Sequence, residues 1–305
     1  MLTWIIGLVL VMVMIALGLP IAFSMAAIGF IGLTFIIGTD ASLAMIGQVF
    51  FDNGMNYTLS ILPLFLLMGN FVVKAGLADE LYSAANAWLR HKKGGLAMAT
   101  IIACGGFSSV CGSSLATTAT MAKIALPSMK KYNYPDSLAT GVIAAGGTLG
   151  ILIPPSMILV LYGIITSQDI GQLFLAGLIP GLLGIIGYII AIKISILLNK
   201  KSFQTQTPLP FVKKVKSLKG VTGIILLFTI VMGGIYTGIF TTTEAAGVGA
   251  FGSLIIVMLK KKISIKSFYE ILIETVKVTS MLFFLLFGAI LFSNFINLAG
   301  LPNDL

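Results

Sequence analysis

Charged residues are scarce in this sequence, and acids are scarcer than bases. Only 10% of the 305 residues are charged, while 58% are hydrophobic and the mean hydropathy is +1.07. A soluble domain needs far more polar surface than this, so the composition excludes a soluble globular protein. Because a spanning helix takes roughly 20 apolar residues, the runs between charge clusters leave room for about eight spans. We expect an all-α polytopic membrane protein.

Cysteine and histidine are also rare, with two and one residues respectively. Cys104 and Cys111 lie in an apolar stretch without a neighbouring histidine or acid, which indicates neither a disulfide framework nor a metal site. His91 lies among basic residues and is expected in a solvated loop. The sequence has no Ser-His-acid set, no paired carboxylates within one segment and no GxxxxGK[ST] motif. It predicts neither an enzyme nor a bound cofactor.

Basic residues are plentiful enough to give a net charge of +9. All but one are lysines, and they form short clusters between apolar runs, a pattern typical of membrane topology rather than of nucleic-acid binding. The cluster at 90–93 and a Lys-rich linker at 200–219 are expected in the cytoplasm. Residues 40–56 contain acids but no lysine or arginine, which predicts an extracytoplasmic loop.

Residues 94–129 have basic residues at both ends, so this segment is expected to enter and leave the membrane on one side. Its centre, GGFSSVCGSS, is too small and too rich in hydroxyls to face lipid. Two full spans are the alternative, but a re-entrant hairpin buried in protein fits better.

The stretch GGTLGILIPPS at 146–156 interrupts a second apolar run. Glycines loosen a helix backbone, and Pro154 and Pro155 each lack an amide donor and clash with the preceding turn. We therefore expect a broken helix at about 137–166. Such a break at membrane depth is tolerated where the freed backbone groups find partners in protein, water or a bound ion.

Two segments resemble one another at a distance of 224 residues. GNFVVKAGLADEL at 69–81 and SNFINLAGLPNDL at 293–305 are identical at six of thirteen positions. The charge pattern orients them oppositely across the membrane, as in an inverted repeat. We expect a first repeat at 1–199, the linker at 200–219, and the start of a second repeat at 220–305 whose remaining part is missing through truncation.

The sequence resembles the large membrane (permease) subunit of tripartite ATP-independent periplasmic (TRAP) transporters, within the ion transporter superfamily. The resemblance covers nearly the whole chain. The motifs that carry it are GLPIAF at 18–23, LPLFLLMGNFVVKAGLADEL at 62–81, GGFSSVCGSSLATTATM at 105–121, GGTLGILIPPS at 146–156 and GGIYTGIFTTTEAAG at 233–247.

This resemblance implies an elevator-type transporter in the bacterial inner membrane that takes up an organic acid, such as a C4-dicarboxylate or sialic acid, driven by sodium. It also implies two partners, a small membrane subunit and a periplasmic substrate-binding protein. The alternative is a stand-alone sodium-coupled carboxylate symporter of the same superfamily. An intramembrane enzyme or a channel is disfavoured by the repeat and the lack of catalytic groups.

The centre of the hairpin is the candidate substrate site. Hydroxyls and backbone amides at a helix start suit a carboxylate, because the helix dipole favours negative charge there. The alternative is that small residues only permit close helix packing. The candidate residues are Ser108, Ser109, Gly112, Ser113, Ser114 and Thr117.

The broken helix is the candidate sodium site, since sodium is a hard cation that takes oxygen ligands. Carbonyls freed near the glycines would supply these ligands, with help from one threonine hydroxyl. The alternative is a purely structural kink. The candidate residues are Gly146, Gly147, Thr148, Gly150 and Pro154.

Four other polar residues call for interpretation. Thr241 and Glu244 match the S/T-x-x-E capping box, which favours a helix cap over a functional acid. Asn70 and Asn294 occupy matching positions of the repeat and are interpreted as buried hydrogen-bonding groups.

Overall fold

The computed structural model describes residues 2–198 and 205–304, and helices are its only regular elements within these ranges. Residues 199–204, which include the start of the linker expected at 200–219, lie outside them. The helices are α1 (Leu2–Ala16), α2 (Ile21–Ile37), α3 (Thr39–Gly54), the 3-10 helix η1 (Tyr57–Ser60), α4 (Ile61–Lys74), α5 (Leu77–Leu89), α6 (Gly95–Cys111), α7 (Ser114–Lys131), α8 (Asp136–Leu152), α9 (Met157–Thr166), α10 (Ile170–Leu198), α11 (Phe211–Leu218), α12 (Thr222–Tyr236), α13 (Thr242–Leu259), α14 (Ile265–Leu298) and α15 (Leu301–Asp304).

This architecture is that of an all-α polytopic membrane protein. Within the described ranges, four helical segments are long and apolar enough to cross a bilayer, or up to six if each of two bent helix pairs counts as one span. The expected number was about eight. The difference arises because other apolar runs, including α2 and α6, form helices of 10–17 residues.

The chain divides into two compact units, the first formed by Met1–Ser60 with Glu274–Leu305. In this unit α2 packs against α1 and α3, and the C-terminal part of α14 lies against α2. Gly29 permits that approach, because a Cβ there would come within 2.8 Å of the Phe292 amide nitrogen. The buried core consists of Val11, Ile28, Leu33, Val49, Leu291, Phe292 and Phe295.

The loop expected at 40–56 is instead mostly helix α3. Its polar residues lie near its two ends. Asp40 is in the first turn, where a carboxylate complements the helix dipole, and Asp52 and Asn53 are in the last. About half of the residues between them are good helix formers, namely alanine, leucine, methionine and glutamine, so the acids that indicate the side of the membrane do not prevent a helix.

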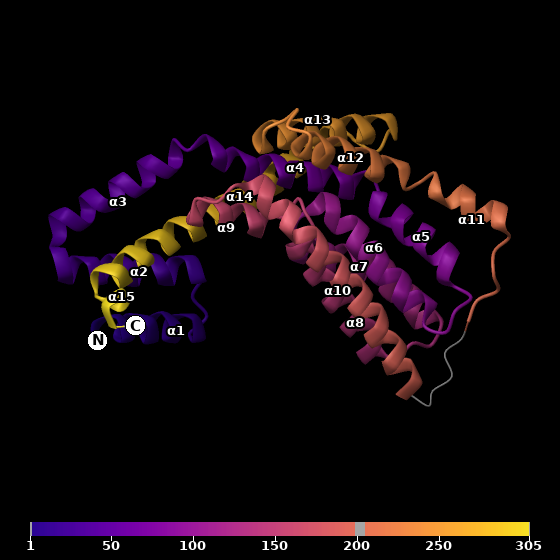
Figure 1. Cartoon of the computed structure of the whole chain (residues 1–305), viewed down its shortest axis with the longest axis horizontal. Helices are drawn as coiled ribbons and strands as arrows, with labels where there is room; N and C mark the ends of the chain where they lie inside the picture. Colours follow the sequence, from indigo (N-terminus) through magenta and orange to yellow (C-terminus); the bar gives the residue numbers. More distant parts are fainter. Residues whose placement is uncertain (1, 199–204, 305) are drawn as a thin grey trace. The chain divides into compact units, whose positions relative to one another are not determined.

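The second unit, Ile61–Ile273, contains α4 to α13. Helices α5, α6, α7, α8 and α10 run side by side, as Figure 1 shows, and successive members of this group contact one another. Helix α4 packs against α6 and α13. Its buried residues are Ile61, Leu62, Phe65, Leu66, Met68, Gly69, Phe71 and Val72.

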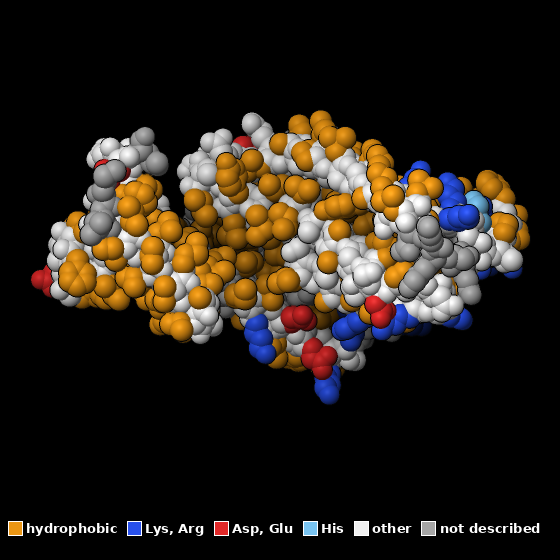
Figure 2. All heavy atoms as spheres, turned by 90° about the horizontal axis from the view of Figure 1, so that it is seen from below, with side chains coloured by type: hydrophobic (Ala, Val, Ile, Leu, Met, Phe, Trp, Pro, Cys, Tyr) orange, Lys and Arg blue, Asp and Glu red, His pale blue; other side chains and the backbone are white. Residues whose placement is uncertain are grey.

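Charge is unevenly distributed over this unit. In Figure 2 apolar side chains cover much of the visible surface, whereas lysine and arginine side chains gather near His91. On the same unit, Lys260 at the end of α13 pairs with Glu80 of α5. The histidine therefore lies in the polar setting predicted from its neighbours.

The two segments related by sequence share one backbone turn. Gly76 and Gly300 both have positive φ, at 71° and 92°. The amide of Gly76 donates to the Val73 carbonyl at 3.0 Å, and that of Gly300 donates to Asn297, the matching position, at 3.2 Å. A glycine at this place is explained by the left-handed conformation that ends each helix. Their opposite direction across the membrane stays a prediction.

Candidate functional site

Helices α6 and α7 form a hairpin inside the predicted segment 94–129. Gly112 ends α6 in the left-handed conformation, with φ of 62°, and its amide donates to the Ser108 carbonyl at 3.1 Å. Ser113 then begins α7 as its N-cap, and its Oγ accepts a hydrogen bond from the Ala116 amide at 3.3 Å. A glycine followed by a serine thus stops one helix and starts the next within two residues.

Helices α8 and α9 form the broken helix, bent by 40° between Leu152 and Met157. Because prolines have no amide hydrogen, Pro154 and Pro155 remove the donors that would pair with the carbonyls of Gly150 and Ile151 in a continuous helix. Ser156 supplies a replacement donor to one of these two carbonyls.

The Ser156 hydroxyl donates to the Ile151 carbonyl at 2.6 Å and accepts from the Leu159 amide at 3.4 Å. It therefore closes α8 and caps α9 at once. The Gly150 carbonyl is left without the amide donor that α-helical pairing would provide.

The tip of the hairpin packs directly into the break. The Met157 amide, at the start of α9, donates to the Gly112 carbonyl at 3.3 Å. A Cβ at Gly112 would lie 2.5 Å from the Pro155 oxygen, and one at Gly150 would lie 2.9 Å from the Ser113 carbonyl carbon. These two glycines are required because backbone meets backbone without space for a side chain.

Four helix ends meet at this place. The N-termini of α7 and α9 carry partial positive charge, and the C-termini of α6 and α8 carry partial negative charge. A carboxylate is favoured at the helix N-termini, and a cation is favoured at the helix C-termini. The arrangement is chemically suited to holding both.

The six candidate substrate residues differ in their surroundings. Ser108 and Thr117 are fully buried; Ser108 Oγ has no hydrogen-bond partner among the described residues, and Thr117 lies beside the Cys111 thiol. The Ser109 hydroxyl donates to the Gly106 carbonyl at 2.7 Å. Gly112, Ser113 and Ser114 form the tip itself.

The five candidate sodium residues differ in their surroundings. Gly146 and Gly147 lie inside α8, where the amides of Gly150 and Ile151 stand in register with their carbonyls. The expectation that their carbonyls are freed is wrong, because the helix continues to Leu152. Gly146 faces Cys104 of α6 and Gly147 faces Thr118 of α7, so both serve close packing.

Thr148 points to another helix. Its hydroxyl donates to the Ala145 carbonyl at 2.7 Å and lies 2.7 Å from the Tyr188 hydroxyl of α10. Pro154 is buried in the break. Of the five candidates, Gly150 is the one whose carbonyl the break deprives of its helical donor.

Sequence reasoning missed Ile151 and Ser156 as parts of this site. The sequence contains a feature that could have identified each of them. Pro155 lies four residues after Ile151, which marks its carbonyl as unpaired, and Ser156 directly precedes an apolar helix, the usual place of an N-cap.

Thr241 and Glu244 form a capping box at the start of α13. The Thr241 amide donates to Glu244 Oε2 at 2.8 Å, and the Glu244 amide donates to Thr241 Oγ1 at 3.3 Å. The Thr241 hydroxyl also donates to the same carboxylate at 2.9 Å. Both side chains are engaged at the helix start, which is the geometry of a cap.

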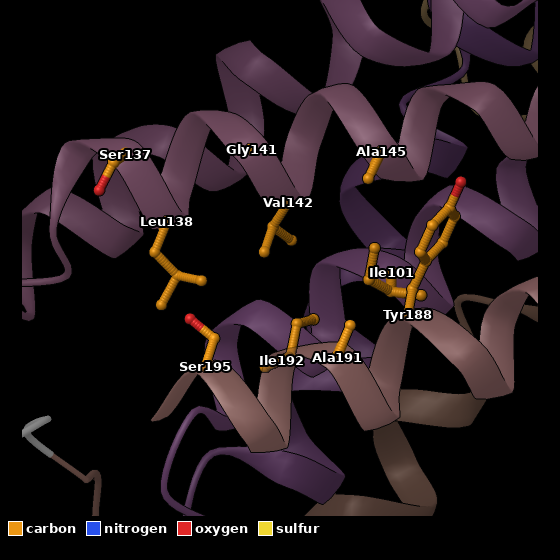
Figure 3. A pocket seen from close by; sticks show the side chains of 10 residues that line it. All are labelled: Ile101, Ser137, Leu138, Gly141, Val142, Ala145, Tyr188, Ala191, Ile192 and Ser195. Atoms are coloured by element: carbon orange, nitrogen blue, oxygen red, sulfur yellow. The ribbon is translucent and has the colours of Figure 1, made fainter. Parts of the chain in front are cut away.

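A separate cavity of about 310 Å³ lies between α8 and α10. Figure 3 shows Ser137, Leu138, Val142 and Ala145 along one helix and Tyr188 to Ser195 along the other, with Ile101 of α6 behind. None of the candidate substrate or sodium residues lines it. Within the described residues no group of three His, Cys, Asp or Glu side chains is placed to hold a metal ion.

Residues 8–305 match the family described as "Tripartite ATP-independent periplasmic transporter, DctM component". The chain is 35% identical over 274 residues to the C4-dicarboxylate TRAP transporter large permease protein DctM of Pseudomonas aeruginosa, which covers 90% of this chain and 64% of that protein. It is 32% identical over 290 residues to the sialic acid TRAP transporter large permease protein SiaM of Vibrio cholerae, covering 94% and 67%.

The 2,3-diketo-L-gulonate TRAP transporter large permease protein YiaN of Escherichia coli is 30% identical over 295 residues, covering 94% of this chain and 67% of that protein. The chain thus spans about two thirds of the length of these relatives. They are named as permease proteins rather than as enzymes, in agreement with the lack of catalytic motifs.

Replacing Gly150 by alanine should separate the hairpin tip from the break, because the added carbon would press on the Ser113 backbone. We expect a destabilisation of about 1–3 kcal/mol, measured by thermal unfolding of the purified chain in detergent. Gly141→Ala is the control on the same helix, since a Cβ there has no neighbour within 4 Å. Equal effects of the two variants would contradict the contact.

Replacing Ser108 by alanine should leave stability unchanged or raise it by up to about 1 kcal/mol, because an unpartnered buried hydroxyl is removed. If that hydroxyl serves a bound substrate or ion, uptake by the reconstituted transporter complex falls although the protein is no less stable. Thr100→Val is the control in the same helix, since this buried hydroxyl donates to the Leu96 carbonyl and is not a candidate site residue. Unchanged uptake in Ser108→Ala would assign the residue to packing alone.

Proposed function

Because the chain belongs to the DctM component family of tripartite ATP-independent periplasmic transporters, we propose that it acts in the sodium-driven uptake of an organic acid. The substrate is delivered by a periplasmic binding protein, and a small membrane subunit completes the complex. The membrane is the bacterial inner membrane, and the mechanism is an elevator movement of hairpin and broken helix against a scaffold.

The substrate class rests on a group shared by the named substrates of the three relatives above, although another relative is named for isethionate, a sulfonate. C4-dicarboxylates, sialic acid and 2,3-diketo-L-gulonate all carry a carboxylate. In this chain the N-terminus of α7 has the capacity for such a group. Ser113 caps the Ala116 amide, which leaves the amides of Ser114 and Leu115 in the first turn for an anion.

The observation that carries the proposal is the contact of the hairpin tip with the helix break, tied by the Met157 amide and the Gly112 carbonyl. It brings helix N-termini and C-termini together in one place. A carboxylate at the N-terminus of α7 and a sodium ion at the C-terminus of α8 would then lie close enough to stabilise each other, which couples their binding.

The decisive experiment is uptake by proteoliposomes that contain the transporter complex. We expect uptake of a labelled organic acid when an inward sodium gradient and the substrate-loaded binding protein are both present, and none when either is left out. Uptake of free substrate that needs no binding protein would instead favour the stand-alone symporter. Uptake without a sodium gradient would refute sodium coupling.

The Gly150 carbonyl as a sodium ligand is tested by Pro154→Ala, which restores an amide donor in helical register with that carbonyl. We expect a higher sodium concentration for half-maximal uptake; a lost ligand worth about 1.4 kcal/mol corresponds to tenfold. Pro127→Ala in α7 is the control, because it removes a proline near the end of that helix that lies opposite to the hairpin tip. A shift equal in both variants would reject the assignment.

A further inference from the structure

Helix α11 carries an apolar face that the rest of its unit leaves largely uncovered. The exposed fractions are 70% for Phe211, 76% for Val212, 45% for Val215 and 43% for Leu218. At 3.6 residues per turn Phe211, Val215 and Leu218 share one side of the helix, while Lys213 and Lys216 lie on the other. A short helix of this pattern is typical of the membrane interface.

The surrounding sequence is strongly basic and free of acids. No aspartate or glutamate occurs between Asp169 and Glu244, whereas seven lysines lie between residues 193 and 219. Juxtamembrane lysine clusters without acids attract the anionic lipids of the cytoplasmic leaflet. The charge of this segment thus complements a lipid phosphate.

An apolar groove of about 320 Å³ lies beside α11. The Phe211 and Trp88 rings meet edge to face, with centroids 6.3 Å apart, so α11 is fixed against one wall of the groove. Its lining has hydrocarbon and aromatic side chains only, which suits an acyl chain and offers no partner for a peptide backbone. The lining residues are Leu81, Ala84, Ala85, Trp88, Leu89, Ile102, Leu218 and Val221.

One lysine lies beside a ring that lines this groove, and a second directly follows a lining residue in the chain. Lys214 Nζ lies 5.8 Å from the centroid of the Trp88 ring, which is part of the lining. Lys219 lies in the chain between Leu218 and Val221, which also line it. The backbone amide of Gln206 donates to the Arg90 carbonyl at 3.1 Å and holds the segment before α11 next to the end of α5. The groove therefore has an apolar floor with lysines near its edge. The acid beside it, Glu80, lies against Gly220 and is paired with Lys260.

We propose that this groove binds one anionic phospholipid, with an acyl chain along α5 and the headgroup phosphate between Lys214 and Lys219. Helix α11 then lies in the interface with its apolar face towards the acyl region. One lining residue, Ile102, belongs to α6, but the groove does not include the hairpin tip or the helix break, and lipid binding there does not depend on the transported substrate.

The test is a titration of the purified chain in neutral detergent with phosphatidylglycerol, followed by native mass spectrometry and thermal unfolding. We expect one retained phosphatidylglycerol per chain and a higher unfolding temperature, with little effect of phosphatidylcholine. Lys214→Gln with Lys219→Gln should weaken binding roughly 30-fold, the effect of two lysines lost from an anionic contact. Lys213→Gln with Lys216→Gln removes the same charge from the opposite face and should leave binding almost unchanged.

The acyl part of the site is tested by Ala85→Phe, which fills the groove, against Ser83→Phe, which adds the same ring to an exposed position of the same helix. We expect loss of the retained lipid in the first variant only, with circular dichroism showing that both are folded. If the Lys214/Lys219 and Lys213/Lys216 double variants weakened lipid binding equally, the binding would depend only on the total charge of the segment. That result would overturn the proposed site. So would retention of the lipid in Ala85→Phe, or inhibition of binding by inorganic phosphate alone.

Discussion

The arrangement of the second unit depends on what happens to backbone groups at a helix break in apolar surroundings. Two consecutive prolines deprive the carbonyls of Gly150 and Ile151 of helical donors, and the amides that start α9 have no partner in their own helix. Such groups are costly where water is absent. Ser156 satisfies one carbonyl and one amide, and the Gly112 carbonyl accepts from Met157. The hairpin tip therefore supplies one of the hydrogen-bond partners that the broken helix needs.

Local features of this region follow from the sequence, because glycine and proline act through their own backbone chemistry. The helix break and the hairpin turn are of this kind. The capping box of Thr241 and Glu244 also follows from the sequence, because its side-chain hydrogen bonds lie within one turn of the chain. The direction of side chains does not follow, since it depends on which helices become neighbours. The sequence places Thr148 among the glycines of the predicted sodium site, yet its hydroxyl lies beside the Tyr188 hydroxyl of α10. Likewise the acids near the ends of α3 suit helix termini as well as a loop.

In the sequence repeat, too, the local turn follows from the local sequence, whereas the orientation of the segments does not. An identity of six positions in thirteen is weak evidence between apolar segments, but Gly76 and Gly300 also share positive φ and the same hydrogen bonds to matching carbonyls. One local sequence has produced one local turn in both units. How the repeats are oriented is a property of the whole chain in a bilayer, so it rests on the distribution of lysines rather than on this turn.

Packing and ligand binding make different demands on the small residues of the site. Gly146 and Gly147 are fully explained by the close approach of Cys104 and Thr118, and they add no weight to an ion site. The ligand hypothesis rests instead on groups that packing leaves unsatisfied. Two such groups are the Ser108 hydroxyl and the Gly150 carbonyl, since nothing in the packing of these helices requires a buried hydroxyl without a partner or a carbonyl without its helical donor.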